Sequence, residues 1–256
     1  MRLHLVVEET VFFHPSFVEK LIKGMTKDEI VGASLVTKVK KKNDIERYMY
    51  RHFYFLTPEE LVKIGGVWAY RHLKNKIDRK KIYSVRRVLE KYGIPYEDVR
   101  FDINTEDHIR FIKEKDPDII LSSQSLYFGR EILALPRICC INRHSGLLPR
   151  NGGLWPGFQA VRKGEKETGV SVHTMEAQID SGVVLSQIKV PVRAGETVWD
   201  IYKECFKVSS KAVMIALDKI RDHDYARADC GYRREYYSFP TKEQWKEFRL
   251  RGGKYI

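Results

Sequence analysis

Two polar side chains suited to acyl chemistry follow a short apolar run. The run is Ile-Cys-Cys-Ile, and Asn142 and His144 come directly after it, two residues apart. Because side chains alternate across a strand, the two can share one face, and open α/β sheets bind ligands beyond the carboxyl ends of their strands. Asp180 arrives 38 residues after Asn142, in an Asp-Ser-Gly turn. An amide, an imidazole and a carboxylate together could transfer an acyl group to an amine.

The three groups would divide that chemistry between them. Attack on an acyl carbon builds a negative oxygen, which the Asn142 amide and a protonated His144 could stabilise; losing one such donor costs about 100- to 1000-fold in rate. We expect Asp180 to raise the pKa of His144 and, directly or through water, to accept the proton of the attacking amine. Spacing alone leaves an alternative open, in which His144 is a core histidine and Asp180 an ordinary turn residue.

The surrounding sequence resembles the folate-dependent formyltransferase family from about Asp116 to Val192. The resemblance rests on Asn-x-His, then Leu-Leu-Pro, a loop with Gly and Pro, Glu-Thr-Gly-Val-Ser-Val-His and Asp-Ser-Gly. That family includes glycinamide ribonucleotide formyltransferase, methionyl-tRNA formyltransferase and the sugar-amine N-formyltransferases. The resemblance implies 10-formyltetrahydrofolate as the donor. It also places Asn142, His144 and Asp180 on the family's catalytic Asn, His and Asp.

The resemblance further implies where the folate would bind. Residues 116–142 resemble the strand and loop that flank the folate in the family. The candidate folate contacts are Gly146, Leu147, Leu148, Pro149 and Ile179. The family pattern has Ser directly before Leu-Leu-Pro, where this chain has Gly146, so a hydroxyl contact is shifted or lost. His173 matches a position where relatives often carry His, and it could equally contact the acceptor or pack beside the site.

The elements expected around these residues form an α/β, Rossmann-like formyltransferase fold with a mostly parallel central sheet. Apolar runs predict strands over 2–7, 30–37, 96–101, 118–122, 138–142, 170–175 and 183–190. Helical spacing predicts helices over about 16–23 and 198–220, and a further helix to about Lys115 that Asn104 would cap. The loop over 8–15 contains no glycine, so the dinucleotide-binding fingerprint is absent.

Residues 38–92 are expected to form a basic, helical insert. Residues 38–87 carry 15 Lys and Arg against 5 Asp and Glu, which is most of the net charge of +12. Thr57 to Glu60 reads as a capping box, and Ser84 can cap a second helix that ends near Gly93. The insert is also rich in aromatic residues, including Trp68 and Tyr70. We expect most of them to pack inward, with base stacking or a membrane surface as the alternative.

The domain boundaries are expected at residue 222, with a catalytic domain over 1–222 and an extension over 223–256. The extension carries its own capping box from Thr241 to Gln244, and we expect it to pack on the core, with a dimer contact as the alternative. The chain has four cysteines without Cys-x-x-Cys spacing. They are expected to be reduced, mostly buried thiols rather than a disulfide or metal site, with Cys139 and Cys140 on opposite faces of one strand.

The amine acceptor does not follow from the resemblance. The missing glycine-rich loop argues against glycinamide ribonucleotide, and only 34 residues follow Asp222, too few for the barrel domain of methionyl-tRNA formyltransferases. An acceptor that is phosphorylated or nucleotide-linked, such as a nucleotide-linked amino sugar, would suit the basic insert. A methionyl-tRNA formyltransferase-like enzyme without the usual C-terminal domain is the second expectation.

A different class of protein also fits the charge. A basic nucleic-acid- or membrane-binding protein on the same scaffold would need no turnover, but the intact Asn142, His144 and Asp180 favour the enzyme. No uncharged apolar run is long enough to span a bilayer, and the N-terminus is not that of a signal peptide. The sequence therefore predicts a cytoplasmic enzyme without a resident metal.

Overall fold

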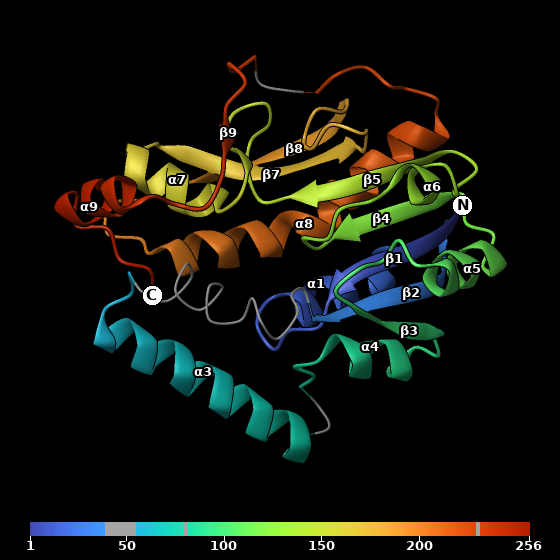
Figure 1. Ribbon diagram of the computed structural model, residues 1–256, viewed down its shortest axis with the longest axis horizontal. Coiled ribbons are helices and arrows are strands. Elements are labelled where there is room, and N and C mark those ends of the chain that lie inside the picture. Colours follow the sequence, from blue (N-terminus) through green and yellow to red (C-terminus); the bar gives the residue numbers. More distant parts are fainter. Residues whose placement is uncertain (39–54, 79–80, 229–230) are drawn as a thin grey trace.

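The computed structural model describes residues 1–38, 55–78, 81–228 and 231–256, and its centre is a seven-stranded sheet. The strand order is β3-β2-β1-β4-β5-β7-β8 (Figure 1). The strands are β1 (Arg2–Glu8), β2 (Glu29–Lys38), β3 (Tyr96–Arg100), β4 (Ile119–Ser123), β5 (Cys139–His144), β7 (Glu167–Thr174) and β8 (Val184–Pro191). All pairings from β3 to β5 are parallel, and β7 and β8 add antiparallel pairings. The predicted fold, a mostly parallel α/β sheet, is confirmed.

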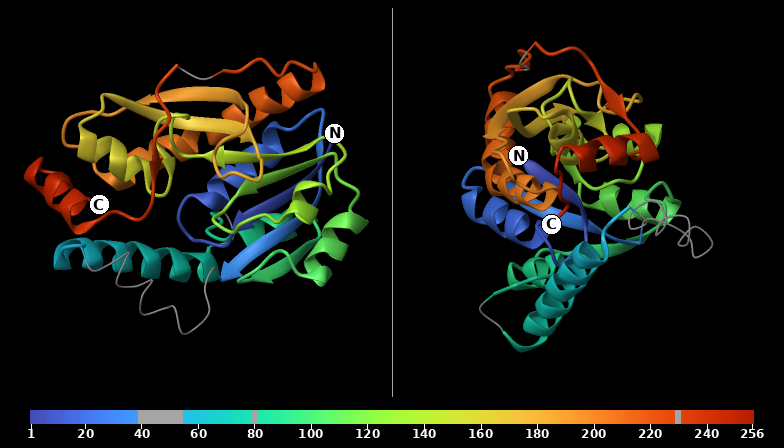
Figure 2. Two further views of the ribbon diagram at one scale, coloured as in Figure 1. Left: turned by 45° about the horizontal axis from the view of Figure 1, so that its top comes forward. Right: turned by 90° about the vertical axis from the view of Figure 1, so that its left-hand side faces the viewer.

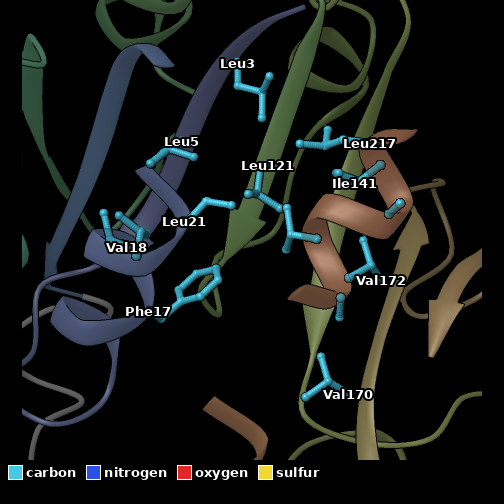
Figure 3. Close-up of a cluster of buried hydrophobic side chains, with 14 of the residues drawn as sticks. Leu3, Leu5, Phe17, Val18, Leu21, Leu121, Ile141, Val170, Val172 and Leu217 are labelled. Carbon is cyan, nitrogen blue, oxygen red and sulfur yellow. The ribbon is translucent and has the colours of Figure 1, made fainter. Parts of the chain in front are cut away.

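Helices cover both faces of this sheet. On one face lie α1 (His14–Gly24), α4 (Val85–Lys91) and the long α8 (Val198–Arg221), and Figure 3 shows side chains of α1 and α8 meeting those of the central strands. On the other face lie α5 (Glu106–Glu114) and α6 (Arg130–Leu133). Cys140 belongs to the second cluster while Cys139 packs against the first, as the alternation of side chains predicts. The buried strands form a rigid base for the residues at their carboxyl ends.

The described part of the insert contains two separate helices. The helix α3 runs over Pro58–Ile77, and α4 follows only after a break, while residues 39–54, part of the predicted insert, lie outside the described residues. The Thr57 capping box and the Ser84 cap are both present. Local capping rules therefore located both helix starts correctly.

One predicted cap and one predicted burial pattern are wrong. Thr105 rather than Asn104 is the N-cap of α5, because the Asn104 side chain bonds to Asp102 and to the backbone of the 127–129 segment. On α3, Trp68 and Tyr70 are 51% and 55% exposed instead of packed inward. Figures 1 and 2 show the reason, since α3 lies beside the sheet rather than on it.

Two ion-pair and hydrogen-bond contacts hold α3 to the body. Near its start, the buried Glu60 accepts hydrogen bonds from Arg249 and from the backbone N–H of Tyr255. In its fourth turn, Arg71 donates to the backbone carbonyls of Val11 and Phe12, in the loop after β1. The insert is therefore tied both to the C-terminal segment and to the first loop of the sheet.

The segment after α8 returns across the molecule to the middle of the chain. Its short strand β9 (Tyr236–Tyr237) pairs with β6 (Gly152–Gly153), and its helix α9 (Lys242–Leu250) begins at the predicted Thr241 capping box. The helix packs on α7 (Pro156–Lys163), as Figure 2 shows at the end opposite β3. Trp245 and Phe248 enter a separate apolar cluster with Phe158. The expectation that this segment packs on the core is confirmed.

Removing the Phe248 ring tests how firmly this segment is attached. Phe248 is fully buried against Phe158 and Trp245, so we expect Phe248→Ala to lower the free energy of unfolding by about 3–5 kcal/mol. Urea denaturation followed by tryptophan fluorescence measures the change. Leu250→Ala is the matched control, because Leu250 is in the same helix but 78% exposed, and it should alter stability by less than about 0.5 kcal/mol. Equal effects of the two substitutions would contradict the packing described.

Candidate active site

The three residues that the sequence selected lie together at the carboxyl end of β5. Asn142 and His144 project from the same face of that strand, and Asp180 reaches them from the loop after β7. The Oδ2 atom of Asp180 is 3.9 Å from Nδ1 of His144. All three line one cavity of about 210 Å³. The fold thus places an amide, an imidazole and a carboxylate at the same opening.

Asp180 is held in an uncommon backbone conformation. Its φ is +52°, a left-handed value that Asp tolerates better than most residues. The backbone N–H of Gly153 donates to its Oδ2 at 2.7 Å. Two residues on, a Cβ at Gly182 would lie 1.8 Å from the carbonyl oxygen of Thr174, so only glycine permits this turn. The Asp-Ser-Gly motif therefore builds the turn that aims the carboxylate.

The orientation of the His144 ring is fixed by one backbone contact. Its Nε2 atom lies 2.8 Å from the carbonyl oxygen of Asn151. A carbonyl only accepts, so Nε2 carries the proton in the neutral ring and Nδ1 is left with its lone pair. This lone pair is on the side of the ring that faces Asp180.

The charges at rest differ in part from the sequence expectation. Burial lowers the pKa of His144, and although Asp180 and the Asn151 carbonyl act to raise it, the net direction is downward. Burial by itself would raise the pKa of Asp180, but His144, His173 and the Gly153 N–H together bring that pKa well below its usual range. The expected effect of Asp180 on the His144 pKa is present, but desolvation outweighs it, so the net shift favours the neutral ring.

His173 completes the group as the immediate partner of Asn142. Its Nδ1 atom lies 2.8 Å from the Thr174 carbonyl oxygen, so Nε2 is free to accept from Nδ2 of Asn142 at 3.2 Å. The same Nε2 is 3.4 Å from Oδ1 of Asp180. His173 is nearly inaccessible, at 2% exposed. Of the two interpretations from the sequence, this burial agrees better with a histidine packed beside the site, where it can orient the Asn142 amide.

The cavity beside these residues has two walls, and each wall is a loop that follows a strand. One wall is the loop after β4, which the family resemblance places beside the folate. The other wall is the loop between β7 and Asp180. The lining side chains from these loops include Gln124, Leu126, Tyr127, Met175, Gln178 and Ile179. Ile179 was predicted, and the other five were not named. The cavity is thus a slot between two loops with polar atoms at its inner end.

Tyr236 lines the same cavity from the distant C-terminal segment. It comes from β9, which pairs with the Gly152–Gly153 strand next to Asp180. Burial and the nearby Asp180 charge raise the pKa of its hydroxyl. Nothing in the local sequence around Tyr236 signals this role, because the pairing joins segments more than 80 residues apart.

Four of the predicted folate contacts lie behind the cavity and do not line it. They are Gly146, Leu147, Leu148 and Pro149. Leu147 and Leu148 are 0% and 1% exposed, and the Ser171 hydroxyl bonds to both ends of this turn. Contact between these four residues and a folate therefore stays a prediction, while their visible role is to support the loop.

The departure at Gly146 from the family pattern has a steric explanation. A Cβ there would lie 2.9 Å from Nε2 of His144 and 3.0 Å from the carbonyl oxygen of Asn151. Ser145 does not replace the missing hydroxyl, because its Oγ is buried and accepts from Arg143 at 2.8 Å. Glycine thus makes room for the contact between His144 and Asn151.

The remaining ionisable groups show no arrangement for metal binding in the described residues. No three His, Cys, Asp or Glu side chains there are grouped closely enough to hold an ion. Cys139, Cys140 and Cys205 are free thiols, and burial raises the pKa of Cys205 to about 12, while Cys230 lies outside the described residues. None of the described helices combines the length and apolar character needed to cross a bilayer.

Comparison with known proteins finds relatives over much of this chain. A family model described as formyl transferase matches residues 76–217. Methionyl-tRNA formyltransferase of Thermotoga maritima is 27% identical over 161 residues, which cover 62% of this chain and 51% of that protein. The chain therefore spans about half the length of the curated relatives it matches.

Solved structures share the fold at low sequence identity. Phosphoribosylglycinamide formyltransferase from Anaplasma phagocytophilum has a TM-score of 0.63 at 16% identity, covering 93% of this chain and 99% of that one. A sugar N-formyltransferase from a Shewanella species has a TM-score of 0.58 at 16% identity, covering 98% and 87%. These likenesses extend the fold assignment to nearly the whole chain.

Proposed function

The chain belongs to the formyl transferase family, and from that premise we propose that it moves a formyl group from 10-formyltetrahydrofolate to a primary amine of an anionic acceptor. The observation that carries this proposal is the meeting of Asn142, His144 and Asp180 at the inner end of one cavity. In the curated relatives the whole protein is about twice as long as the matched region, so activity and acceptor are proposed here for this chain.

The cavity has the character that a folate donor requires. A pterin is a flat, polar heterocycle, and small-molecule sites combine apolar walls with a few placed polar groups. Here Leu126, Met175 and Ile179 offer apolar surface, while Gln124 and Gln178 offer amides. A folate seated between these loops would bring its formyl-bearing nitrogen, N10, toward Asn142 at the inner end.

The reaction then needs a proton acceptor for the amine. The amine lone pair attacks the formyl carbon, a C–N bond forms, and the carbonyl π electrons move onto oxygen. In the ligand-free state His144 has a free Nδ1 lone pair facing Asp180, so it can take the amine proton at this step. Asp180, an anion at rest, then stabilises the imidazolium. In the alternative path, the amine proton passes to Asp180 itself, either directly or through a water molecule.

Collapse of the intermediate completes the transfer. Nδ2 of Asn142, oriented by His173, can donate to the negative oxygen while it exists. The newly charged His144 is a second donor to that oxygen. At this one step it therefore acts as the protonated donor that the sequence predicted. As the bond between the formyl carbon and N10 breaks, the imidazolium returns its proton to N10, and tetrahydrofolate and the formylated amine leave.

For the acceptor we propose an anionic amine, with a nucleotide-linked amino sugar as the leading candidate. The loop after β1 does not offer a glycine-rich phosphate cradle; instead Phe12 and Phe13 pack on Trp199. Arg71 ties the basic helix α3 to this same loop, which places positive charge from the insert on the side of β1. Methionyl-tRNA is the second candidate, because the curated relatives at 27–34% identity carry that name.

Calorimetry with a stable 10-formyltetrahydrofolate analogue tests the donor site. We expect saturable one-to-one binding to the wild type and binding weakened about tenfold in Asn142→Ala, since one hydrogen-bonding group is lost. Asn75→Ala is the matched control, because Asn75 is on α3 outside the cavity and its Oδ1 accepts from Tyr83 and Arg87. Absence of binding by the wild type at high analogue concentration would remove the basis of the proposed function.

Product analysis by mass spectrometry then separates the acceptors. The wild type would be incubated with 10-formyltetrahydrofolate and, in parallel, a nucleotide-linked amino sugar, glycinamide ribonucleotide or methionyl-tRNA. Formylation of the amino sugar alone would support the leading candidate. Formylation of methionyl-tRNA alone would replace it with the second.

A further inference from the structure

The backbone of one tripeptide, residues 151–153, contacts both His144 and Asp180. The Asn151 carbonyl accepts from Nε2 of His144, and two residues later the Gly153 N–H donates to Asp180. Both contacts come from the backbone, so their geometry depends on what fixes the path of residues 151–153. That path is unusual, because Asn151 itself has a φ of +59°.

The Asn151 side chain is held by the buried carboxylate of Glu165. It is 0% exposed, and its Nδ2 donates to Oε2 of Glu165 at 2.8 Å. Glu165 has a side chain only 8% exposed and is paired with Nζ of Lys163 at 2.9 Å and with Nε of Arg150 at 3.5 Å. The carboxylate is thus itself immobilised, and it can hold the Asn151 side chain in one position.

The C-terminal segment clamps the same tripeptide from the other side. The N–H of Gly152 donates to the Glu235 carbonyl at 3.1 Å, and the N–H of Leu154 donates to the Tyr237 carbonyl at 2.8 Å. The Glu235 side chain also pairs with Lys163 at 2.6 Å. Lys163 therefore links the clamp to the anchor through two carboxylates.

We propose that Asn151 and Glu165 are positioning residues for the formyl transfer, holding the Asn151 carbonyl where it keeps the proton of neutral His144 on Nε2 and leaves Nδ1 free for the amine. This inference rests on the proposed function for its reaction, but its structural core concerns the His144 tautomer alone. A histidine ring is directed by whatever its second nitrogen bonds. Asn suits this position for two reasons. It tolerates a left-handed φ, and its side-chain N–H can donate to Glu165.

The alternative is that Asn151 and Glu165 merely stabilise the loop. A structural role would change folate binding, stability and transfer together, whatever residue stands at 144. A positioning role acts through His144, so it should vanish when His144 is absent. The two roles therefore separate in a double-mutant cycle.

The first experiment measures transfer for Asn151→Gly, which keeps the left-handed backbone and deletes only the side chain. We expect kcat to fall by about 10- to 100-fold, because small displacements of a catalytic group carry costs of that size. The folate Kd and the acceptor KM should change less than threefold. In a His144→Ala background the same substitution should change the residual rate by less than twofold. His223→Gly, at another left-handed but exposed residue, controls for the added glycine.

A second pair of variants guards against a loop that simply unfolds. Asn151→Asp sets two carboxylates against each other and should lower kcat at least as much as Asn151→Gly. Glu165→Gln keeps an acceptor oxygen for the Asn151 amide and should lose much less. Combining Asn151→Asp with Glu165→Gln exchanges donor and acceptor and should recover at least tenfold of the rate lost in Asn151→Asp alone. Failure of the combined variant to recover any rate would overturn the proposal.

A readout without turnover separates this inference from the proposed function. Nitrogen-15 NMR of the ring should show the Nε2–H tautomer of neutral His144 in the wild type and a growing share of Nδ1–H in Asn151→Gly. An unchanged tautomer in that variant would overturn the positioning role even if the enzyme transfers formyl groups. A changed tautomer in a protein that binds no folate analogue would instead uphold it while rejecting the proposed function.

Discussion

Asp180→Asn is expected to lower kcat for formyl transfer by at least about 1000-fold, while leaving folate binding within about threefold. The substitution removes the charge but keeps the shape, and Asn accepts the left-handed φ of +52° that Ala would resist. Without that charge, the imidazolium formed at His144 has no anion 3.9 Å away to stabilise it. Single-turnover kinetics with saturating donor measure the chemical step directly.

Asp116→Asn is the matched control for this substitution. Asp116 is also a left-handed aspartate, with a φ of +45°, but its side chain is 62% exposed in a surface pair with Arg137. Exposed ion pairs contribute little to stability, so this variant should transfer at the wild-type rate. If Asp180→Asn kept more than a tenth of the wild-type kcat, Asp180 would lose its assignment as a catalytic residue.

His144→Ala is expected to lower kcat by about 100- to 1000-fold, because it removes both the acceptor of the amine proton and one donor to the oxyanion. Calorimetry with the folate analogue should show a Kd within threefold of the wild type. His223→Ala, at an exposed histidine outside the cavity, should leave both quantities unchanged. A variant with normal kcat would show that another group accepts the proton.

The pH dependence of the same reaction reports the direction in which the His144 pKa is shifted. Burial lowers that pKa below 6.5; among the neighbouring groups Asp180 and the Asn151 carbonyl raise it, and His173 and Arg143 lower it. A neutral His144 is the active form, so kcat/KM, corrected for titration of the amine, should stay level as pH falls to 6.5. It should decline only below that value. An acid limb above pH 6.5 that disappears in His144→Ala would mean that His144 is charged at rest.

Much of this site followed from sequence because its determinants are local. Asn142 and His144 share a face because any strand alternates its side chains, and Asp180 sits in a turn that the following glycine alone can make. Likewise the capping boxes at Thr57 and Thr241 are contacts within four residues, so the local order of residues was enough to locate them.

The features that sequence missed all depend on contacts between distant segments. Tyr236 reaches the cavity through a strand pairing that no local pattern encodes, and Asn104 lost its capping role to partners more than 20 residues away. Trp68 and Tyr70 belong to an aromatic-rich segment that was expected to pack inward, yet the position of α3 beside the sheet leaves them exposed.

The sequence by itself indicated that Asn142, His144 and Asp180 meet at the site, and only the tertiary structure decided their protonation and orientation. Sequence placed a carboxylate near His144 and suggested a cation. The degree of burial, which comes from every segment packed around the ring, lowers the pKa of His144 and favours its neutral form. The Asn151 carbonyl then selected the nitrogen that keeps the proton. Desolvation and hydrogen-bond direction are properties of a surrounding volume, and that volume exists only after the chain has folded.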